Sequence, residues 1–137
     1  ENAIGFDGTS PAYDKTDEPV PADQAFVAQL KSVAEDVGQT VHTGLYATFD
    51  AFYRDMFALD EAGRDRVEAN RQMLADRGVM ATDMETSALL TAAKVLGVSC
   101  ASLCLGTVDA ITQQKLGAEP LAAGEDMLFD LALKGMA

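Results

Sequence analysis

The feature that most limits the fold of this chain is its alternation of helical and extended sequence patterns. Four stretches favour helix, and short runs of apolar or β-forming residues separate them. The helical stretches lie at about 22–37, 60–77, 84–96 and 119–136, and the extended runs lie at 3–6, 40–49, 79–80 and 98–108. Gly38 and Gly97 follow two of the helical stretches and mark their ends. This alternation predicts an α/β fold, and 137 residues suffice for one small domain with its own core.

The run from Val98 to Val108 contains no charged residue and ends at Asp109. Continuous apolar character of this kind is typical of a strand that is covered on both faces, so we expect a central strand here. Both cysteines, Cys100 and Cys104, belong to this run and would share one face of a strand. Because no second cysteine pair completes four zinc ligands, we expect free thiols in a reducing compartment and no metal site.

An acidic turn joins the predicted strand at 79–80 to the predicted helix at 84–96. Thr82 and Glu85 have the spacing of a capping box, in which a threonine hydroxyl and a glutamate carboxylate accept hydrogen bonds from otherwise unpaired amides. The helix macrodipole also favours acidic groups at this end of a helix. On spacing alone, helix capping is the simplest interpretation, and a ligand-binding role needs support from the rest of the chain.

The charge of the chain excludes several kinds of partner. Lys and Arg number 10 and Asp and Glu number 22, which gives a formal net charge of −12. Nucleic acids and anionic membrane faces both require a basic surface. An acidic protein can still bind phosphate, but only through a local cluster of arginines or backbone amides. Most arginines lie in the helix at 60–77, where we expect them to be surface charge on a solvated helix. Since no secretion signal or membrane-spanning run is present, we expect a soluble, cytoplasmic protein.

Three parts of the sequence, taken together, resemble one enzyme family. They are Phe6–Ser10, Asp50–Tyr53, and the Gly78–Met80 strand followed by Met84–Leu90. In this combination the chain resembles the nucleoside phosphorylases of the uridine phosphorylase and hexameric purine nucleoside phosphorylase type. The resemblance runs through nearly the whole chain but covers only the second half of the family's domain. It implies that residues 1–137 form the C-terminal half of a single mixed-sheet, three-layer α/β domain.

The resemblance implies roles for five residues. Glu85 would accept hydrogen bonds from the ribose hydroxyls, and Met84 would pack against the sugar. Phe52 and Tyr53 would lie against the base, although aromatic residues at a strand end are equally suited to core packing. Asp109 would protonate the departing base, which requires a pKa raised by apolar neighbours. The structural alternative for Asp109 is a residue that caps a loop or a helix.

The sequence departs from both branches of the family where the base is recognised. The uridine branch has a glutamine and an arginine shortly after its Phe-Tyr element, whereas Arg54 is followed by Asp55–Ala58 without glutamine. The purine branch pairs its aspartate with a downstream arginine, and no arginine follows Asp109. The Thr112–Gln114 segment again resembles the uridine branch. The sequence therefore does not select between purine and pyrimidine.

The glycine-rich loop and the arginines that hold phosphate in the family belong to the half that the resemblance does not cover. We therefore expect a nucleoside phosphorylase that is completed by a second chain or fragment carrying the N-terminal half. Phosphate is then the co-substrate, no other cofactor is needed, and the protein is an oligomer. A parallel sheet without its remaining strands has open edges, so the chain alone should not be a stable monomer. The alternatives are a nucleoside hydrolase that uses water and a non-catalytic or regulatory nucleoside-binding subunit.

Overall fold

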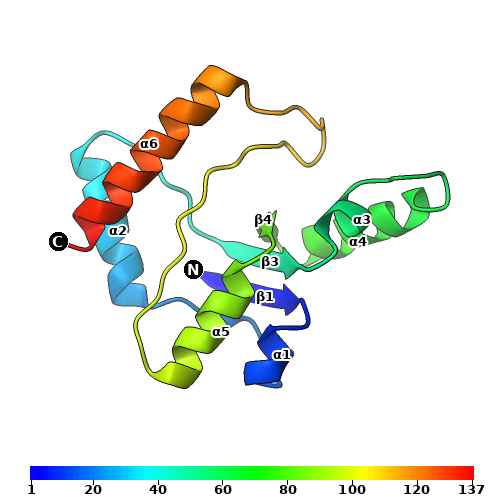
Figure 1. The fold of residues 1–137 in the computed structure, drawn as a ribbon, viewed down its shortest axis with the longest axis horizontal. Helices are drawn as coiled ribbons and strands as arrows, with labels where there is room; N and C mark the ends of the chain where they lie inside the picture. The colour runs from blue at the N-terminus through cyan, green and yellow to red at the C-terminus, as the bar shows by residue number, and fades with distance from the viewer.

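The computed structural model describes all 137 residues as one four-stranded mixed sheet with six helices (Figure 1). The strand order is β2–β1–β3–β4, in which β1, β3 and β4 are parallel and β2 is antiparallel to β1. The strands are β1 Asn2–Phe6, β2 Val20–Pro21, β3 Leu45–Phe49 and β4 Val79–Asp83. The helices are α1 Ser10–Tyr13, α2 Gln24–Asp36, α3 Phe52–Met56, α4 Arg64–Asp76, α5 Thr86–Leu96 and α6 Ala118–Gly135. The prediction of an α/β fold is confirmed.

Helices cover both faces of the sheet, which gives three layers. Because successive strand residues point to opposite faces, Ala3 and Ile4 of β1 belong to different cores. One core joins the sheet to α3 and α4, and the other joins it to α5. The buried members are Ile4, Ala47, Phe49, Met56 and Leu74 in the first core, and Ala3, Val20, Ala22 and Leu90 in the second. The strand ends are thus held from both sides.

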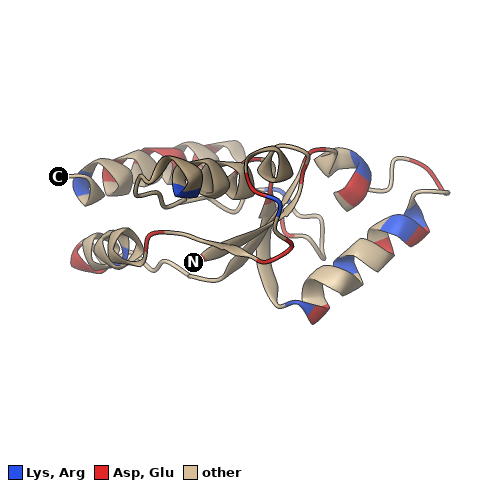
Figure 2. Ribbon diagram, turned by 90° about the horizontal axis from the view of Figure 1, so that it is seen from below, with Lys and Arg blue, Asp and Glu red and all other residues tan.

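The helices α2 and α6 pack against each other at the end of the molecule opposite α4 (Figures 1 and 2). Their approach is close at Gly135, where an added Cβ would lie 2.5 Å from Leu30 Cδ2. Helix α2 begins at Asp23, whose side chain caps it by accepting the amide of Phe26 at 2.9 Å. The Ser99 hydroxyl also donates to Asp23, at 2.6 Å, and this bond is the main cause of a lowered pKa at Asp23. The segment after α5 is therefore attached to the start of α2.

The four predicted helices and three of the four predicted strands are present, with shifted ends. The strand predicted at 40–49 begins only at Leu45, and the strand predicted at 79–80 continues to Asp83. Gly97 ends α5 in the left-handed conformation, with a φ of 66°, as expected for a glycine after a helix. The short elements α1, β2 and α3 contain too few residues for a periodic pattern, so the sequence does not reveal them.

The prediction of a central strand at 98–108 is wrong for this chain. The segment is extended but pairs with no strand, and its one ladder contact is an isolated bridge between Val108 and Lys115. From residue 99 to residue 106 the backbone makes a single hydrogen bond, in which Asp23 N donates to Cys100 O at 2.8 Å. A strand needs a neighbouring strand as its hydrogen-bond partner, and none of the four strands pairs with this segment. The segment therefore has the composition of a covered strand without a pairing partner in this chain.

No helix is long and apolar enough to cross a membrane. No three His, Cys, Asp or Glu side chains come together as candidate metal ligands. Both cysteines are free thiols, and partial burial raises the pKa of Cys100.

Candidate functional site

The carboxyl ends of β1, β3 and β4 meet along one edge of the sheet because the three strands are parallel. An aspartate stands at each of these strand ends: Asp7, Asp50 and Asp83. Ligands of α/β proteins commonly bind at this edge. Glu85 lies two residues beyond Asp83, and the Phe52–Tyr53 pair closely follows Asp50. The structure therefore brings the ribose and base candidates to the same edge, on neighbouring strands.

A fully buried threonine, Thr48, connects the end of β3 to the start of α5. Its Oγ1 donates to Asp83 Oδ1 at 2.7 Å and accepts the backbone N–H of Ser87 at 2.9 Å. Asp83 Oδ1 also accepts the backbone amides of Glu85 at 3.3 Å and Thr86 at 3.2 Å. Asp83 and Thr48 thus satisfy amides that a helix start leaves without internal partners. These amides are not available to a phosphate, which would need them as donors.

A second group of hydrogen bonds ties the end of β1 to the same helix. Ser10 Oγ donates to Asp7 Oδ2 at 2.8 Å and lies 2.7 Å from Ser87 Oγ. Because the single hydroxyl proton of Ser10 goes to Asp7, Ser87 is the donor in the serine pair. The Gly8 amide donates to Asp50 Oδ2 at 2.8 Å, which joins the ends of β1 and β3. The start of α5 is therefore held from two strands at once.

Glu85 and Met84 lie on the exposed side of this turn. Glu85 is the N-cap residue of α5, and its carboxylate makes no hydrogen bond within the chain. Met84 is 40% exposed. The capping-box prediction is wrong, because Thr82 is a strand residue paired with Ala47 and the capping bonds come from Asp83. Pairing with β3 carries β4 past Thr82, and the Glu85 carboxylate is left without a hydrogen-bond partner in the chain.

Phe52 and Tyr53 begin α3 and form an aromatic group with Phe57. The ring centroids lie 5.7 Å apart for Phe52 and Tyr53, 5.8 Å for Phe52 and Phe57, and 5.9 Å for Tyr53 and Phe57. Phe52 packs on the core beneath α3, whereas Tyr53 is 67% exposed. Phe52 is therefore part of the packing beneath α3, and Tyr53 is the more exposed ring of the pair.

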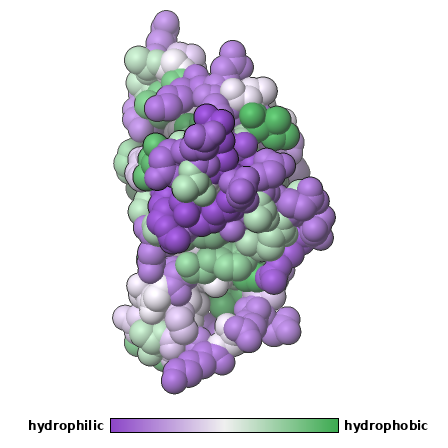
Figure 3. Space-filling view, turned by 90° about the vertical axis from the view of Figure 1, so that its right-hand side faces the viewer, coloured by the Kyte–Doolittle hydropathy of each residue, from purple (hydrophilic) through white to green (hydrophobic).

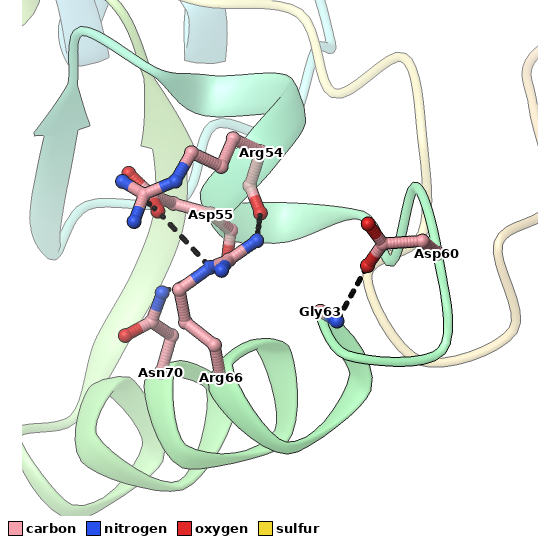
Figure 4. Close-up of polar contacts among 6 residues, drawn as sticks. All are labelled: Arg54, Asp55, Asp60, Gly63, Arg66 and Asn70. Carbon is pink, nitrogen blue, oxygen red and sulfur yellow. Dashed lines mark hydrogen bonds and ion pairs between the residues drawn. The ribbon is translucent and has the colours of Figure 1, made fainter.

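Polar contacts hold α3 on α4 (Figure 4). The Arg66 guanidinium donates to Arg54 O at 3.1 Å and lies 3.6 Å from Asp55 Oδ1. The Asn70 amide donates to Asp55 O at 2.9 Å, and Arg54 forms an ion pair with the Asp55 carboxylate at 3.3 Å. The arginines of this helix were expected to be mainly surface charge, and one of them, Arg66, also contacts α3. It fixes the short helix that carries the Phe52–Tyr53 pair.

Asp109 lies on the loop between the extended segment and α6. Its Oδ1 accepts the amides of Thr112 at 2.7 Å and Ile111 at 3.0 Å, and the Thr112 hydroxyl at 2.9 Å. The bond from the Thr112 amide is the main reason that the pKa of Asp109 is lowered. The expected apolar setting is absent, since Ile111 is 87% exposed. In this structure Asp109 closes a turn, as in its structural alternative, and no hydrogen bond or ion pair joins it to Glu85 or Tyr53.

The tip of the same loop reaches the aromatic group. Gln113 lines an open cavity of about 460 Å³ together with Phe57, Arg64 and Arg71. Gln113 has a φ of 60°, a conformation that residues other than glycine seldom adopt. A glutamine, which the sequence lacks shortly after its Phe-Tyr element, thus lines the same cavity as Phe57, together with two arginines of α4.

Positive charge is not concentrated at the carboxyl edge. Figure 2 shows Lys and Arg spread along α4 among acidic residues, and the surface at this end of the molecule is mostly hydrophilic with separate apolar patches (Figure 3). Arg54 and Arg66 are both paired with Asp55, and Arg77 lies 5.7 Å from the centroid of the Phe6 ring. The edge therefore presents carboxylates and aromatic rings rather than a cluster of arginines.

Thr48 and Ser87 are the residues of this site that sequence reasoning missed. The available signal was weak: Thr48 is a polar residue near the carboxyl end of an otherwise apolar strand, the Leu45–Phe49 run. Hydroxyl residues are common in strands and in helix starts, so their type alone does not mark them.

The chain is similar to proteins of one superfamily. A family model described as the phosphorylase superfamily matches residues 1–125. The chain is 30% identical to the uridine phosphorylase of Klebsiella aerogenes over 117 residues, which are 83% of this chain and 46% of that protein. Identity and coverage are the same for the uridine phosphorylase of Salmonella typhimurium. The guanosine phosphorylase of Halorubrum lacusprofundi is 29% identical over 103 residues, 75% of this chain and 37% of that protein. The chain thus spans about half the length, or less, of these curated relatives.

Proposed function

Because this chain belongs to the phosphorylase superfamily, we propose that it forms the C-terminal half of a nucleoside phosphorylase domain. In this proposal it supplies the ribose and base side of the active site. The substrates are a nucleoside and inorganic phosphate, the products are free base and ribose 1-phosphate, and no other cofactor takes part. The base is left open as purine or pyrimidine, since the relatives include uridine and guanosine phosphorylases.

The observation that carries the proposal is the Glu85 carboxylate, which stands at the ligand-binding edge of the sheet without an internal hydrogen bond. An ionised carboxylate accepts strong hydrogen bonds from the hydroxyls of a ribose. We assign Met84, partly exposed beside it, to packing on the sugar. The Phe52–Tyr53 pair follows the neighbouring strand, and we assign it to the base, with Tyr53 as the accessible ring.

In the proposed reaction a phosphate oxygen forms a bond to C1′ of the ribose while the glycosidic C–N bond breaks. The bonding electrons leave with the base, and phosphate stabilises the positive charge that develops on the sugar. Glu85 holds the ribose in one orientation. Asp109 delivers a proton to the base nitrogen. For this step Asp109 must first exchange its bonds to Thr112 and Ile111 for a proton, because those bonds favour the charged carboxylate.

A second polypeptide with the N-terminal half supplies the phosphate site in this proposal. The unpaired backbone from residue 99 to residue 106 supports it, because unpaired strand edges recruit other strands. A cavity of about 660 Å³ lies beside this segment, and apolar side chains of the segment, α2 and α6 form part of its lining. A strand and apolar side chains from the other half would satisfy this backbone and fill this cavity.

The proposal also describes an oligomer in the cytoplasm. The free thiols Cys100 and Cys104 support a reducing compartment. Large apolar side chains exposed on α5 and α6 support further association, because monomers seldom expose many of them. They are Leu89, Val95, Leu96, Phe129 and Leu133.

Product analysis of the complete protein tests the proposed reaction. The protein is incubated with uridine or guanosine, with and without inorganic phosphate, and the base and sugar products are separated. Phosphorolysis predicts free base and ribose 1-phosphate only when phosphate is present. Free ribose formed without phosphate would overturn the proposal in favour of a hydrolase. Nucleoside binding without any product would overturn it in favour of a non-catalytic subunit.

A further inference from the structure

We propose that Thr48 is a positioning residue for Glu85, acting through the Asp83 carboxylate and the backbone of Ser87. The inference rests on the proposed function and deepens it. Glu85, the proposed ribose ligand, follows β4, whereas Thr48, which would hold it in place, belongs to β3. Thr48 touches neither the sugar nor the base in this account. It determines where the carboxylate of Glu85 stands.

Glu85 depends on its backbone for its direction. Its φ of −135° and ψ of −33° lie outside the regular helix that begins at the next residue. Its exposed side chain has no hydrogen bond within the chain. A displacement of about 1 Å in a substrate-positioning group can cost an enzyme about 100-fold in rate. The bonds on either side of Glu85 therefore decide whether its carboxylate can hold a ribose.

One atom, Thr48 Oγ1, bonds to the Asp83 side chain before Glu85 and to the backbone after it. It donates to Asp83 Oδ1 at 2.7 Å, two residues before Glu85, and accepts the N–H of Ser87 at 2.9 Å, two residues after it. Asp83 Oδ1 in turn accepts the amide of Glu85 itself. Thr48 is fully buried, so water does not take the place of its hydroxyl without a rearrangement.

Helix α5 is attached to the sheet by other contacts that do not involve Thr48. Ser87 Oγ bonds to Ser10 Oγ at 2.7 Å, and Leu90 is buried in the core between α5 and the sheet. Loss of the Thr48 hydroxyl should therefore loosen the turn around Glu85 while α5 stays in place. Positioning can then be separated from folding by experiment.

Three variants of the complete protein make this separation. Thr48→Val removes the hydroxyl at nearly constant side-chain shape, and Thr48→Ser keeps it. Thr91→Val is the matched control, because Thr91 is equally buried and its hydroxyl donates to the Ser87 carbonyl at 2.8 Å, one turn along α5. The control removes the same group without touching the bonds of Thr48 or Asp83.

Amide hydrogen exchange gives a readout that does not depend on activity. Thr48→Val should speed exchange at Glu85 and Ser87 by about tenfold or more relative to the rest of α5, since local opening sets these rates. Thr48→Ser and Thr91→Val should keep the wild-type rates at Glu85. Unchanged exchange at both amides in Thr48→Val would overturn the positioning role.

A pair of nucleosides gives the second readout. kcat/KM is measured with phosphate for a ribonucleoside and for the same nucleoside without its 2′- and 3′-hydroxyls. Thr48→Val should lower kcat/KM for the ribonucleoside by about 10- to 100-fold. The loss should be far smaller for the dideoxynucleoside, which lacks the groups that Glu85 binds. Thr48→Ser should restore the ribonucleoside activity, and Thr91→Val should leave the ratio of the two nucleosides unchanged.

These outcomes separate failure of the positioning role of Thr48 from failure of the proposed function. Equal losses on both nucleosides would show that Thr48 is only structural, and would leave the proposed function standing. Absence of phosphorolysis by the wild-type protein would overturn the proposed function, whatever the exchange rates show.

Discussion

Two regions of this chain differ in where their hydrogen-bond partners lie. At the carboxyl edge of the sheet, the ends of β1, β3 and β4 are bonded to the start of α5 through Ser10, Thr48, Asp83 and Ser87. The segment from residue 99 to residue 106 is extended like a strand but has a single backbone hydrogen bond. The carboxyl edge thus finds its hydrogen-bond partners within this chain. In our proposal the extended segment finds its partners in the polypeptide that completes the domain.

The largest expected effect is on the extended segment. Its amides should exchange rapidly in this chain alone and gain protection of about 1000-fold or more once it pairs within the complete protein. Amides at Thr86 and Ser87 should be protected in both states, since their acceptors are in the chain. Exchange at the segment that stays rapid in the complete protein would contradict the pairing.

The two regions should also differ in their response to loss of a leucine. Leu90 is buried against the sheet, so Leu90→Ala should lower the free energy of unfolding by about 2–5 kcal/mol. Leu103→Ala in the half-buried extended segment should cost about 1 kcal/mol or less. Urea unfolding of this chain at one fixed concentration measures both values. Equal costs would show that the extended segment is as well packed as the edge.

Two glycines, one at the carboxyl edge and one in the extended segment, allow the same comparison with a smaller expected change in the free energy of unfolding. A Cβ at Gly5 would lie 2.6 Å from both Asp7 Oδ2 and Ser87 Oγ, whereas a Cβ at Gly106 would meet nothing within 4 Å. Gly5→Ala should therefore lower the free energy of unfolding by about 1–3 kcal/mol. Gly106→Ala should change it by about 0.5 kcal/mol or less. The same urea titration measures both, and an unaffected Gly5→Ala variant would mean that the edge network adjusts without cost.

The smallest expected effect concerns pH. Hydrogen bonds lower the pKa of Asp109 and of Asp23 from an ordinary value of 3.8. A lowered pKa in the folded state means that the charged group stabilises the fold above its unfolded pKa, and that this contribution is lost as pH falls through the folded pKa. Asp109→Asn and Asp23→Asn should each be slightly less stable than wild type at neutral pH.

The difference from wild type should shrink once the pH is taken well below 3.8. Urea midpoints measured along a pH series provide the comparison. A difference that stays constant across the series would mean that the carboxylate charge is not what the variants remove.

The parts of the fold that the sequence predicted are those that depend on neighbours along the chain. Helix α5 was predicted from its apolar face and from Gly97, and the structure confirms it. The prediction of a strand at 98–108 was wrong. An apolar run indicates that a segment is buried, but it does not show whether another strand pairs with that segment. The Thr82 capping box was wrong because pairing of Thr82 with Ala47 extends β4, which local spacing does not reveal.

The candidate site shows the same limit. Glu85, Met84 and the Phe52–Tyr53 pair were predicted from a resemblance, and the parallel strands bring their segments to one edge. Their roles remain predictions. Thr48 could not be singled out, because the positioning role that we propose for it rests on contacts with residues 35 and 39 positions away. Asp109 was expected in apolar surroundings, and the exposed turn that it closes depends on the loop conformation.

Substitution of Glu85 tests the central claim most directly. In the complete protein, Glu85→Gln keeps the shape of the side chain but removes the charge that strengthens its bonds to ribose hydroxyls. We predict that kcat/KM for a ribonucleoside falls by about 100-fold, while Glu125→Gln, an exposed control on α6, leaves it unchanged. A Glu85→Gln protein as active as the control would contradict the assignment of this edge to the ribose.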